Sequence, residues 1–213
     1  MTALSPLELV TSERQALCLA LSQAGPLAPT LCEGWETRHM LAHLLLRESQ
    51  PLAAAGVVGG PLAARTDRLT GQLADDLAEP ERYEQGLARF QALPGYLGMR
   101  SRAPQLDLAM NLLEYFVHTE DVRRAADATV EPRTLQDEVQ QKLWEALRKR
   151  ARLMAGKKFP PGLVLDAPGY RPSVHTVIAP HPGQRAQILT GQPGELVLYL
   201  FGREDASQAT LAG

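Results

Sequence analysis

The sequence predicts a mainly α-helical protein, with a four-helix bundle followed by a small α+β C-terminal unit that has a short β-sheet. Up to about residue 155, apolar residues recur at the three- and four-residue spacing of amphipathic helices. From Pro160 onward, short apolar runs are separated by proline and glycine, which is typical of short strands. The length of 213 residues fits one domain plus a small appendage. We therefore expect a helical bundle at residues 1–156 and a small β-rich domain at residues 157–213.

Start signals and apolar spacing predict the helices of the first part. Ser5 suits an N-cap, Pro6 suits the first helical position, and Glu8 puts an acid in the first turn. The predicted helices cover residues 5–24, 36–50, 80–92, 105–126 and 134–155, with one further helix around residues 62–77. We expect loops at residues 27–34 and at residues 93–104, where proline and glycine gather.

Four apolar runs bounded by turn residues predict the strands of the second part. They cover residues 163–165, 174–178, 187–189 and 195–201. A unit of about 55 residues is near the lower size limit for independent stability. We therefore expect this unit to pack on the helices.

Composition narrows the class of protein. Apolar residues make up 45% of the chain and charged residues 22%, as in ordinary globular proteins. A net charge of -2 gives no sign of the basic face that nucleic-acid binding requires. The sequence shows neither an apolar run long enough to span a bilayer nor the basic and then apolar start of a secretory signal. We therefore expect a cytoplasmic protein that binds neither nucleic acid nor membrane.

The two cysteines, Cys18 and Cys32, are too few for a disulfide framework. Cys18 lies in an apolar helical stretch, so we expect an inert buried thiol. Cys32 precedes Gly34 and Trp35, and we expect it to pack as a small residue at a turn. A role as a metal ligand would need a partner at matching spacing, and the sequence offers none.

Glu114, His118 and Asp121 are the most informative polar residues of the chain. Glu114 and His118 are four residues apart in a predicted helix, so they share one face with Cβ atoms roughly 5–6 Å apart. From there, a carboxylate oxygen and an imidazole nitrogen can reach one ion at the usual bond length of about 2.0–2.2 Å. Asp121 is placed to accept the other imidazole N–H of His118, as carboxylates behind metal-bound histidines do. An exposed ion pair is the alternative, but apolar neighbours such as Leu113 and Phe116 predict burial, and buried Glu and His need partners.

His39 and His43 form a second candidate group, in the helix predicted for residues 36–50. His43 is in the middle of an apolar stretch, where a lone histidine is more often a hydrogen-bonded core residue than a ligand. His39 lies one turn earlier on the same face, and the pair could bind a metal by itself, as i, i+4 histidines do in zinc proteases. The glutamate that such proteases place between the two histidines is absent here.

Three motifs follow one another along the chain. They are Pro29-Thr-Leu-Cys-Glu-Gly-Trp35 with Ala42-His43-Leu44, then Glu114-x-x-x-His118-x-x-Asp121, then Gly191-Gln-Pro-Gly-Glu-Leu196 with Phe201-Gly-Arg203. In this order they resemble the mycothiol-dependent maleylpyruvate isomerase family, and more closely an uncharacterised metal-binding subgroup of it. That family belongs to the DinB/YfiT-like superfamily of four-helix-bundle metalloproteins. The likeness extends over nearly the whole chain, including the β-rich part.

The resemblance implies a fold and a set of ligands. It implies a DinB-like bundle in which His43, Glu114 and His118 hold one divalent ion, usually taken as zinc, with nickel as the alternative. Asp121 would support His118 from behind. His39 departs from the family pattern, in which an acidic residue is usual at this position. We expect His39 to support a ligand or to lie at the surface rather than to bind the ion.

Three interpretations of such a centre remain open. Three nitrogen and oxygen ligands leave a coordination position free, which is the mark of a reactive zinc site. The resemblance favours a low-molecular-weight thiol, of the mycothiol or bacillithiol type, bound as thiolate for S-transfer or isomerisation of a small molecule. A hydrolase that uses metal-bound hydroxide is the second interpretation. A non-catalytic metal-binding or stress-response module with a structural ion is the third.

A thiol cofactor of this kind carries sugar hydroxyls and carboxylates, so its site should contain a cation. Arg47, one turn after His43, and Arg203, in the Phe-Gly-Arg motif, are the candidates. A surface salt bridge is the alternative role for each arginine. We expect a small-molecule substrate and a thiol as partners, and a monomer or a homodimer.

Overall fold

The computed structural model describes residues 4–50, 63–95, 98–125 and 130–213. The chain divides into two compact units with the boundary near residue 128, so that one unit carries the elements α1 to α7 and the other the elements α8 to β4. Within the described residues, none of the helices combines the length and the apolar character needed to cross a bilayer.

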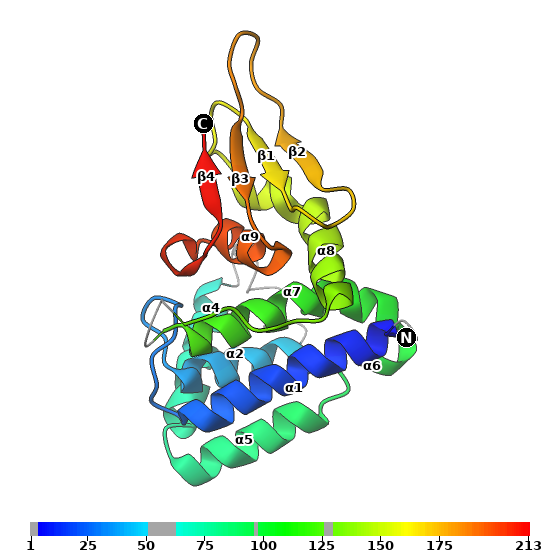
Figure 1. Ribbon diagram of the computed structural model, residues 1–213. Helices are drawn as coiled ribbons and strands as arrows, with labels where there is room; N and C mark the ends of the chain where they lie inside the picture. The colour runs from blue at the N-terminus through cyan, green and yellow to red at the C-terminus, as the bar shows by residue number, and fades with distance from the viewer. Residues whose placement is uncertain (1–3, 51–62, 96–97, 126–129) are drawn as a thin grey trace. The chain divides into compact units, whose positions relative to one another are not determined.

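The first unit, called the helical unit here, is a bundle built around helix α1. Its elements are α1 (Pro6–Ala24), α2 (Thr37–Ser49), α4 (Ala63–Asp76), α5 (Pro80–Ala92), α6 (Met99–Arg102) and α7 (Pro104–Arg123). Helix α1 packs against α7 and α5, as Figure 1 shows, and α2 packs against α4 and α5. These helices confirm the predicted ones, including the helix expected around residues 62–77, whereas α6 lies within residues 93–104, which were predicted to be a loop.

The start of α1 follows the predicted capping pattern. The Ser5 hydroxyl accepts a hydrogen bond from the Glu8 backbone N–H at 3.3 Å, and the Glu8 carboxylate accepts one from the Ser5 N–H at 2.7 Å. This reciprocal capping box satisfies two of the backbone donors that a helix start leaves without partners. The helix ends at Gly25, whose φ of 75° is a conformation that glycine adopts without steric cost.

The core of the helical unit joins α1, α2, α4, α5 and α7. Its largest members are the aromatic side chains of Tyr83, Phe90 and Tyr115, each no more than 1% exposed. Helices α2 and α5 approach closely at Gly86, where a Cβ atom would lie 3.1 Å from a methyl group of Leu41. Residues 40–46 of α2 and 111–117 of α7 are nearly all buried. The polar side chains within these two stretches therefore lie in an otherwise apolar interior.

The second unit, called the C-terminal unit, combines two helices with a four-stranded sheet. Its elements are α8 (Asp137–Ala155), β1 (Leu163–Asp166), β2 (Val174–Ile178), β3 (Gln187–Thr190), α9 (Pro193–Leu200), a 3-10 turn (Glu204–Ala206) and β4 (Thr210–Ala212). The strand order is β2-β1-β3-β4, with β1 parallel to β3 and both outer pairs antiparallel. Helix α8 packs against α9 and β2. The mainly helical fold with a small C-terminal sheet is thus confirmed.

Two details of the C-terminal unit differ from the prediction. Residues 195–201 were predicted as a strand, but Pro193–Leu200 form helix α9. This short helix is buried on almost every side, so it lacks the apolar periodicity that distinguishes a helix from a strand. Pro193 at the first helical position and Glu195 in the first turn were the signals of a helix start. The exposed strand β4 (Thr210–Ala212) was not predicted.

The boundary between the units also lies elsewhere than the predicted division into residues 1–156 and 157–213. Helix α8 groups with the sheet because its buried face meets α9 and β2. The Trp144 indole of α8 donates to the Pro172 carbonyl at 2.6 Å, and the Gly194 N–H donates to Gln140 of α8 at 3.0 Å. Taking α8 into the C-terminal unit enlarges that unit's core.

Candidate metal centre

Helices α2 and α7 bring His43, Glu114 and His118 together. The Glu114 Oε1 atom lies 3.1 Å from His43 Nε2 and 3.3 Å from His118 Nε2. The two imidazole rings meet edge to face, with centroids 5.5 Å apart. His43 is 7% exposed, and Glu114 and His118 are half-buried. Two nitrogen donors thus converge on one carboxylate oxygen at the edge of an apolar interior.

The spacing of these three side chains suits a small divalent ion. One ligand atom from each residue lies within 4.8 Å of the other two. Two atoms bound to one tetrahedral zinc ion at near 2.1 Å are about 3.4 Å apart. The contacts of 3.1 and 3.3 Å therefore need to open only slightly to admit an ion. Imidazole and carboxylate are ligands that zinc and nickel both accept, so the residues fit the metal that the sequence resemblance implies.

The charges of Glu114 and His118 are set by one another. Burial raises the pKa of Glu114, but hydrogen bonds with His118 and His43 and the positive charges of His118 and Arg47 outweigh it and hold this pKa well below its usual value. Burial lowers the pKa of His118, but contacts with Asp121, Cys32 and Glu114 outweigh it and raise this pKa well above its usual value. In the metal-free protein, a proton on His118 therefore balances the Glu114 carboxylate. A bound cation would take over that role.

Asp121 holds the far side of the His118 ring. Its Oδ2 atom lies 2.9 Å from His118 Nδ1, and its side chain is fully buried. This contact favours a proton on Nδ1, which leaves Nε2 free to bind an ion. The Leu31 N–H donates to the Asp121 carbonyl at 3.1 Å, so the loop before α2 is tied to the same turn of α7.

Cys32 also reaches Asp121, which the sequence did not predict. The Cys32 Sγ atom lies 3.3 Å from Asp121 Oδ2, and ligand atoms of Cys32, His118 and Asp121 are within 4.8 Å of one another. The partner that the sequence did not offer for Cys32 is therefore Asp121 of α7, which lies 89 residues further along the chain. Its place beside Gly34 and Trp35 in a family-like motif was the one sequence signal that pointed to the site.

Arg47 lies against Glu114 and is directed at helix α7. Its guanidinium donates to Asn111 Oδ1 at 2.6 Å and to the Met110 carbonyl at 3.3 Å, and its Nε atom lies 3.5 Å from Glu114 Oε1. Asn111 in turn donates to the Asp107 carboxylate at 2.6 Å. These contacts hold the Arg47 guanidinium in place beside the Glu114 carboxylate. Contact of Arg47 with a thiol cofactor stays a prediction.

Trp35 flanks the centre on the side of His43. The indole and imidazole ring centroids are 5.3 Å apart. The loop that carries Trp35 is fixed by short hydrogen bonds, since the Trp35 carbonyl accepts from the Thr30 N–H at 3.1 Å and from the Thr30 hydroxyl at 2.8 Å. The indole therefore lies against the His43 ring, tilted by 53° to it.

The two remaining predicted residues, His39 and Arg203, have other contacts. The His39 Nδ1 atom accepts from the Glu36 N–H at 3.2 Å and so caps the start of α2, and His39 belongs to neither group of ligand atoms found among the described residues. Arg203 lies in the C-terminal unit, where its guanidinium donates to the Phe201 carbonyl at 2.6 Å. Roles for His39 behind a ligand and for Arg203 in thiol binding stay predictions.

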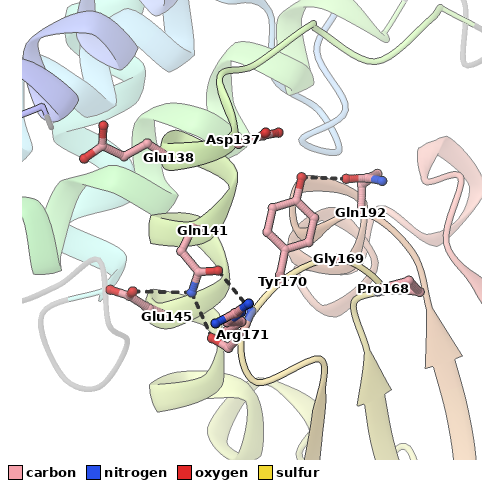
Figure 2. A pocket seen from close by; sticks show the side chains of 9 residues that line it. All are labelled: Asp137, Glu138, Gln141, Glu145, Pro168, Gly169, Tyr170, Arg171 and Gln192. Atoms are coloured by element: carbon pink, nitrogen blue, oxygen red, sulfur yellow. Dashed lines mark hydrogen bonds between the residues drawn. The ribbon is translucent and has the colours of Figure 1, made fainter. Parts of the chain in front are cut away.

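The C-terminal unit has an open pocket of about 740 Å³ between α8 and the loop that joins β1 to β2. Several of its polar groups form hydrogen bonds with one another (Figure 2). The Gln141 amide bridges the backbone N–H and carbonyl of Arg171 at 3.1 and 2.9 Å, and the Tyr170 hydroxyl donates to Gln192 at 2.9 Å. Neither group of possible metal ligands among the described residues includes a residue of this pocket. The candidate centre is therefore the one in the helical unit.

Comparison with known proteins gives one informative similarity. No family model matches the sequence, and no curated protein matches it. Among solved structures, the chain is similar to a histidine-to-alanine mutant of the mycothiol-dependent maleylpyruvate isomerase, with a TM-score of 0.58 and 18% identity. The similarity covers 100% of this chain and 96% of the other. It confirms the predicted DinB-like fold with its C-terminal sheet.

Proposed function

We propose that the helical unit binds one divalent ion, zinc in preference to nickel, through His43, Glu114 and His118. The convergence of two Nε2 atoms on Glu114 Oε1 at 3.1 and 3.3 Å carries this proposal. Three protein ligands leave a coordination position for an exogenous group, as in reactive rather than structural zinc sites.

Neighbouring residues would hold the three ligands in place. Asp121 keeps the Nδ1 proton of His118 in a hydrogen bond of 2.9 Å, so that the Nε2 lone pair points away from it. Arg47 lies 3.5 Å from Glu114 Oε1 and limits rotation of that carboxylate. Ligands oriented in this way need less reorganisation when an ion binds.

We further propose that the centre activates a low-molecular-weight thiol, of the mycothiol or bacillithiol type, for isomerisation of a small molecule or transfer to it. When bound, the ion would supply the positive charge that stabilises a thiolate. The similar solved protein is described as a mycothiol-dependent isomerase, which favours this use of the centre over hydrolysis. Burial raises the pKa of the Cys18 thiol to about 11, so Cys18 is a poor nucleophile.

Metal content after dialysis tests the ligand assignment. The wild-type chain should retain about one zinc ion per chain, and Glu114→Ala and His118→Ala should each retain almost none, because two ligands on a solvated ion bind weakly. His181→Ala, an exposed residue of the C-terminal unit, is the matched control and should keep the wild-type content. Full metal content in both ligand variants would disprove the assignment.

Thiol titration of the cobalt-substituted protein tests the proposed chemistry. A thiolate-to-cobalt charge-transfer band should appear with mycothiol or bacillithiol and be absent with the S-methylated thiol. The absence of a band with either thiol, together with hydrolysis of ester substrates, would favour a metal-hydroxide enzyme instead. A closed four-coordinate cobalt spectrum that no thiol changes would favour a structural ion.

A further inference from the structure

The His118 ring has a carboxylate on each side. Glu114 Oε1 lies 3.3 Å from Nε2, and Asp121 Oδ2 lies 2.9 Å from Nδ1. A neutral imidazole carries one proton, so one nitrogen donates a hydrogen bond while the other can bind a metal. Both tautomers of His118 find an acceptor for their N–H. The ring can therefore offer its metal-binding nitrogen to either side.

The Nδ1 side of the ring has its own set of ligand types. Cys32 Sγ and Asp121 Oδ2 are 3.3 Å apart, and one ligand atom from each of Cys32, His118 and Asp121 lies within 4.8 Å of the other two. A sulfur and an oxygen bound to one tetrahedral zinc ion at usual bond lengths are about 3.6 Å apart. The three side chains thus stand close to the spacing that an ion requires.

The backbone around Cys32 fixes its position. The Cys32 N–H donates to the Thr30 hydroxyl at 3.2 Å, and the Cys32 carbonyl accepts from the Trp35 N–H at 2.9 Å. The Leu31 N–H holds the loop to the Asp121 carbonyl. Cys32 is half-buried, which leaves a route for an ion, whereas Asp121 is fully buried. A ligand set held in this way needs little rearrangement to bind.

We propose that Cys32, His118 and Asp121 form a second cation position, selective for thiophilic ions, on the opposite side of the His118 ring from the first. Thiolate is a soft ligand that cadmium and cuprous ions favour over nitrogen and oxygen. Binding there releases the thiol proton of Cys32 and the Nδ1 proton of His118 to solvent. The His118 Nε2–H then donates to Glu114.

Because the two positions share one imidazole, they exclude each other. An ion at His43 and Glu114 takes His118 Nε2, and an ion at Cys32 and Asp121 takes Nδ1. This competition rests on the proposed zinc centre. The second cation position itself does not depend on that centre. Thiophilic ions should therefore displace zinc from the protein rather than add to it.

Cadmium titration of the metal-free full chain tests the second position through the ultraviolet sulfur-to-cadmium charge-transfer band. The band should saturate at about one equivalent in the wild type, in His43→Ala, which lacks the first centre, and in the matched control Cys18→Ser. Cys32→Ser should lose the band while keeping the wild-type circular dichroism. A band that survives Cys32→Ser, or that Cys18→Ser removes, overturns the proposal.

Two further readouts need no variant. One equivalent of cadmium should slow the alkylation of Cys32 at least tenfold, measured by mass spectrometry, and leave the alkylation of Cys18 unchanged. An unchanged rate at Cys32 overturns the second position. Cadmium added to the zinc-loaded protein should release one zinc ion per cadmium bound. Retention of both ions on one chain overturns the sharing of His118. This result is independent of the zinc centre, which the metal content of Glu114→Ala and His118→Ala tests.

Discussion

Two polar clusters of the helical unit both include residues of α2 and α7, and they balance their charges differently. In the first cluster, Arg14 of α1 donates to both Glu48 carboxylate oxygens at 2.8 and 2.9 Å and to the Tyr115 hydroxyl at 3.0 Å. The Arg14 and Glu48 side chains are at most 2% exposed, and the guanidinium stacks 4.1 Å above the Phe90 ring. Every charge in this cluster has a fixed partner of opposite sign.

In the second cluster, the Arg47 guanidinium lies 3.5 Å from Glu114 Oε1 and directs hydrogen bonds to Asn111 and the Met110 carbonyl. His43, Glu114 and His118 balance their charge through a proton on His118 that can leave. A buried ion pair is permanent, whereas a protonated histidine can be replaced by a metal ion. From this difference we expect ion binding at the cluster whose positive partner is exchangeable, and none at the Arg14–Glu48 pair. Helices α2 and α7 contribute to both clusters, so helix position does not distinguish them.

Removing the fixed cation should give the largest effect on stability. We expect Arg14→Leu to lower the free energy of unfolding by about 3–5 kcal/mol, because it leaves the Glu48 charge buried and unpaired. The change is measured by denaturant unfolding of the metal-free chain. The double variant Arg14→Leu/Glu48→Leu should recover much of this loss, and the folded fraction of the single variant should keep its zinc. A loss below about 1 kcal/mol would show that Arg14 does not balance a buried Glu48 charge.

Removing the carboxylate behind His118 should act on metal affinity instead. We expect Asp121→Asn to weaken zinc binding by about 10–100-fold, because His118 loses the acceptor that fixes its tautomer. Competition with a chromophoric chelator measures the change. His181→Ala, an exposed residue of the C-terminal unit, is the matched control for this prediction, and its zinc affinity should stay near that of the wild type. An unchanged zinc affinity in Asp121→Asn would show that Asp121 does not hold His118 for metal binding.

The exchangeable proton predicts opposite pH trends for stability and for metal binding. The pKa of His118 is raised from its usual 6.5, so the stability it adds to the metal-free protein is fully present below that pH and is lost as the pH rises through the raised value. Comparison of wild-type and His118→Gln melting temperatures across this interval measures the loss. Zinc must displace the same proton, so its affinity should rise by about tenfold per pH unit over the interval. A zinc affinity independent of pH there would contradict the proposed exchange.

His39 should give the smallest effect. We expect His39→Ala to cost about 1 kcal/mol or less of stability, the value of one helix-start hydrogen bond, and to leave zinc content unchanged. Thermal unfolding and elemental analysis measure the two quantities. A loss of zinc in His39→Ala would place this residue within the centre after all.

Part of the candidate centre could be predicted from local spacing, and part could not. The i, i+4 relation of Glu114 and His118 and the place of Asp121 follow from helix geometry. His43 joined them only through the family resemblance, because no local rule brings α2 against α7. The contact of Cys32 with Asp121 depends on the loop before α2 packing on the last turns of α7, which is a tertiary event. Long-range packing, rather than local propensity, thus completes both sets of ligands.

The fold shows the same limit. Helices with a polar face, such as α5 and α8, were predicted because their periodicity is visible. Helix α9 was taken for a strand because burial on almost every side removes that periodicity. The placement of α8 with the sheet depends on contacts such as that of Trp144 with Pro172, which no local pattern encodes.

X-ray absorption at the zinc edge of the wild-type chain loaded with one equivalent of zinc tests the central claim most directly. We expect nitrogen and oxygen ligands at about 2.0–2.1 Å with the scattering signature of two imidazoles. A zinc shell that contains sulfur at about 2.3 Å, or only one imidazole, would contradict it.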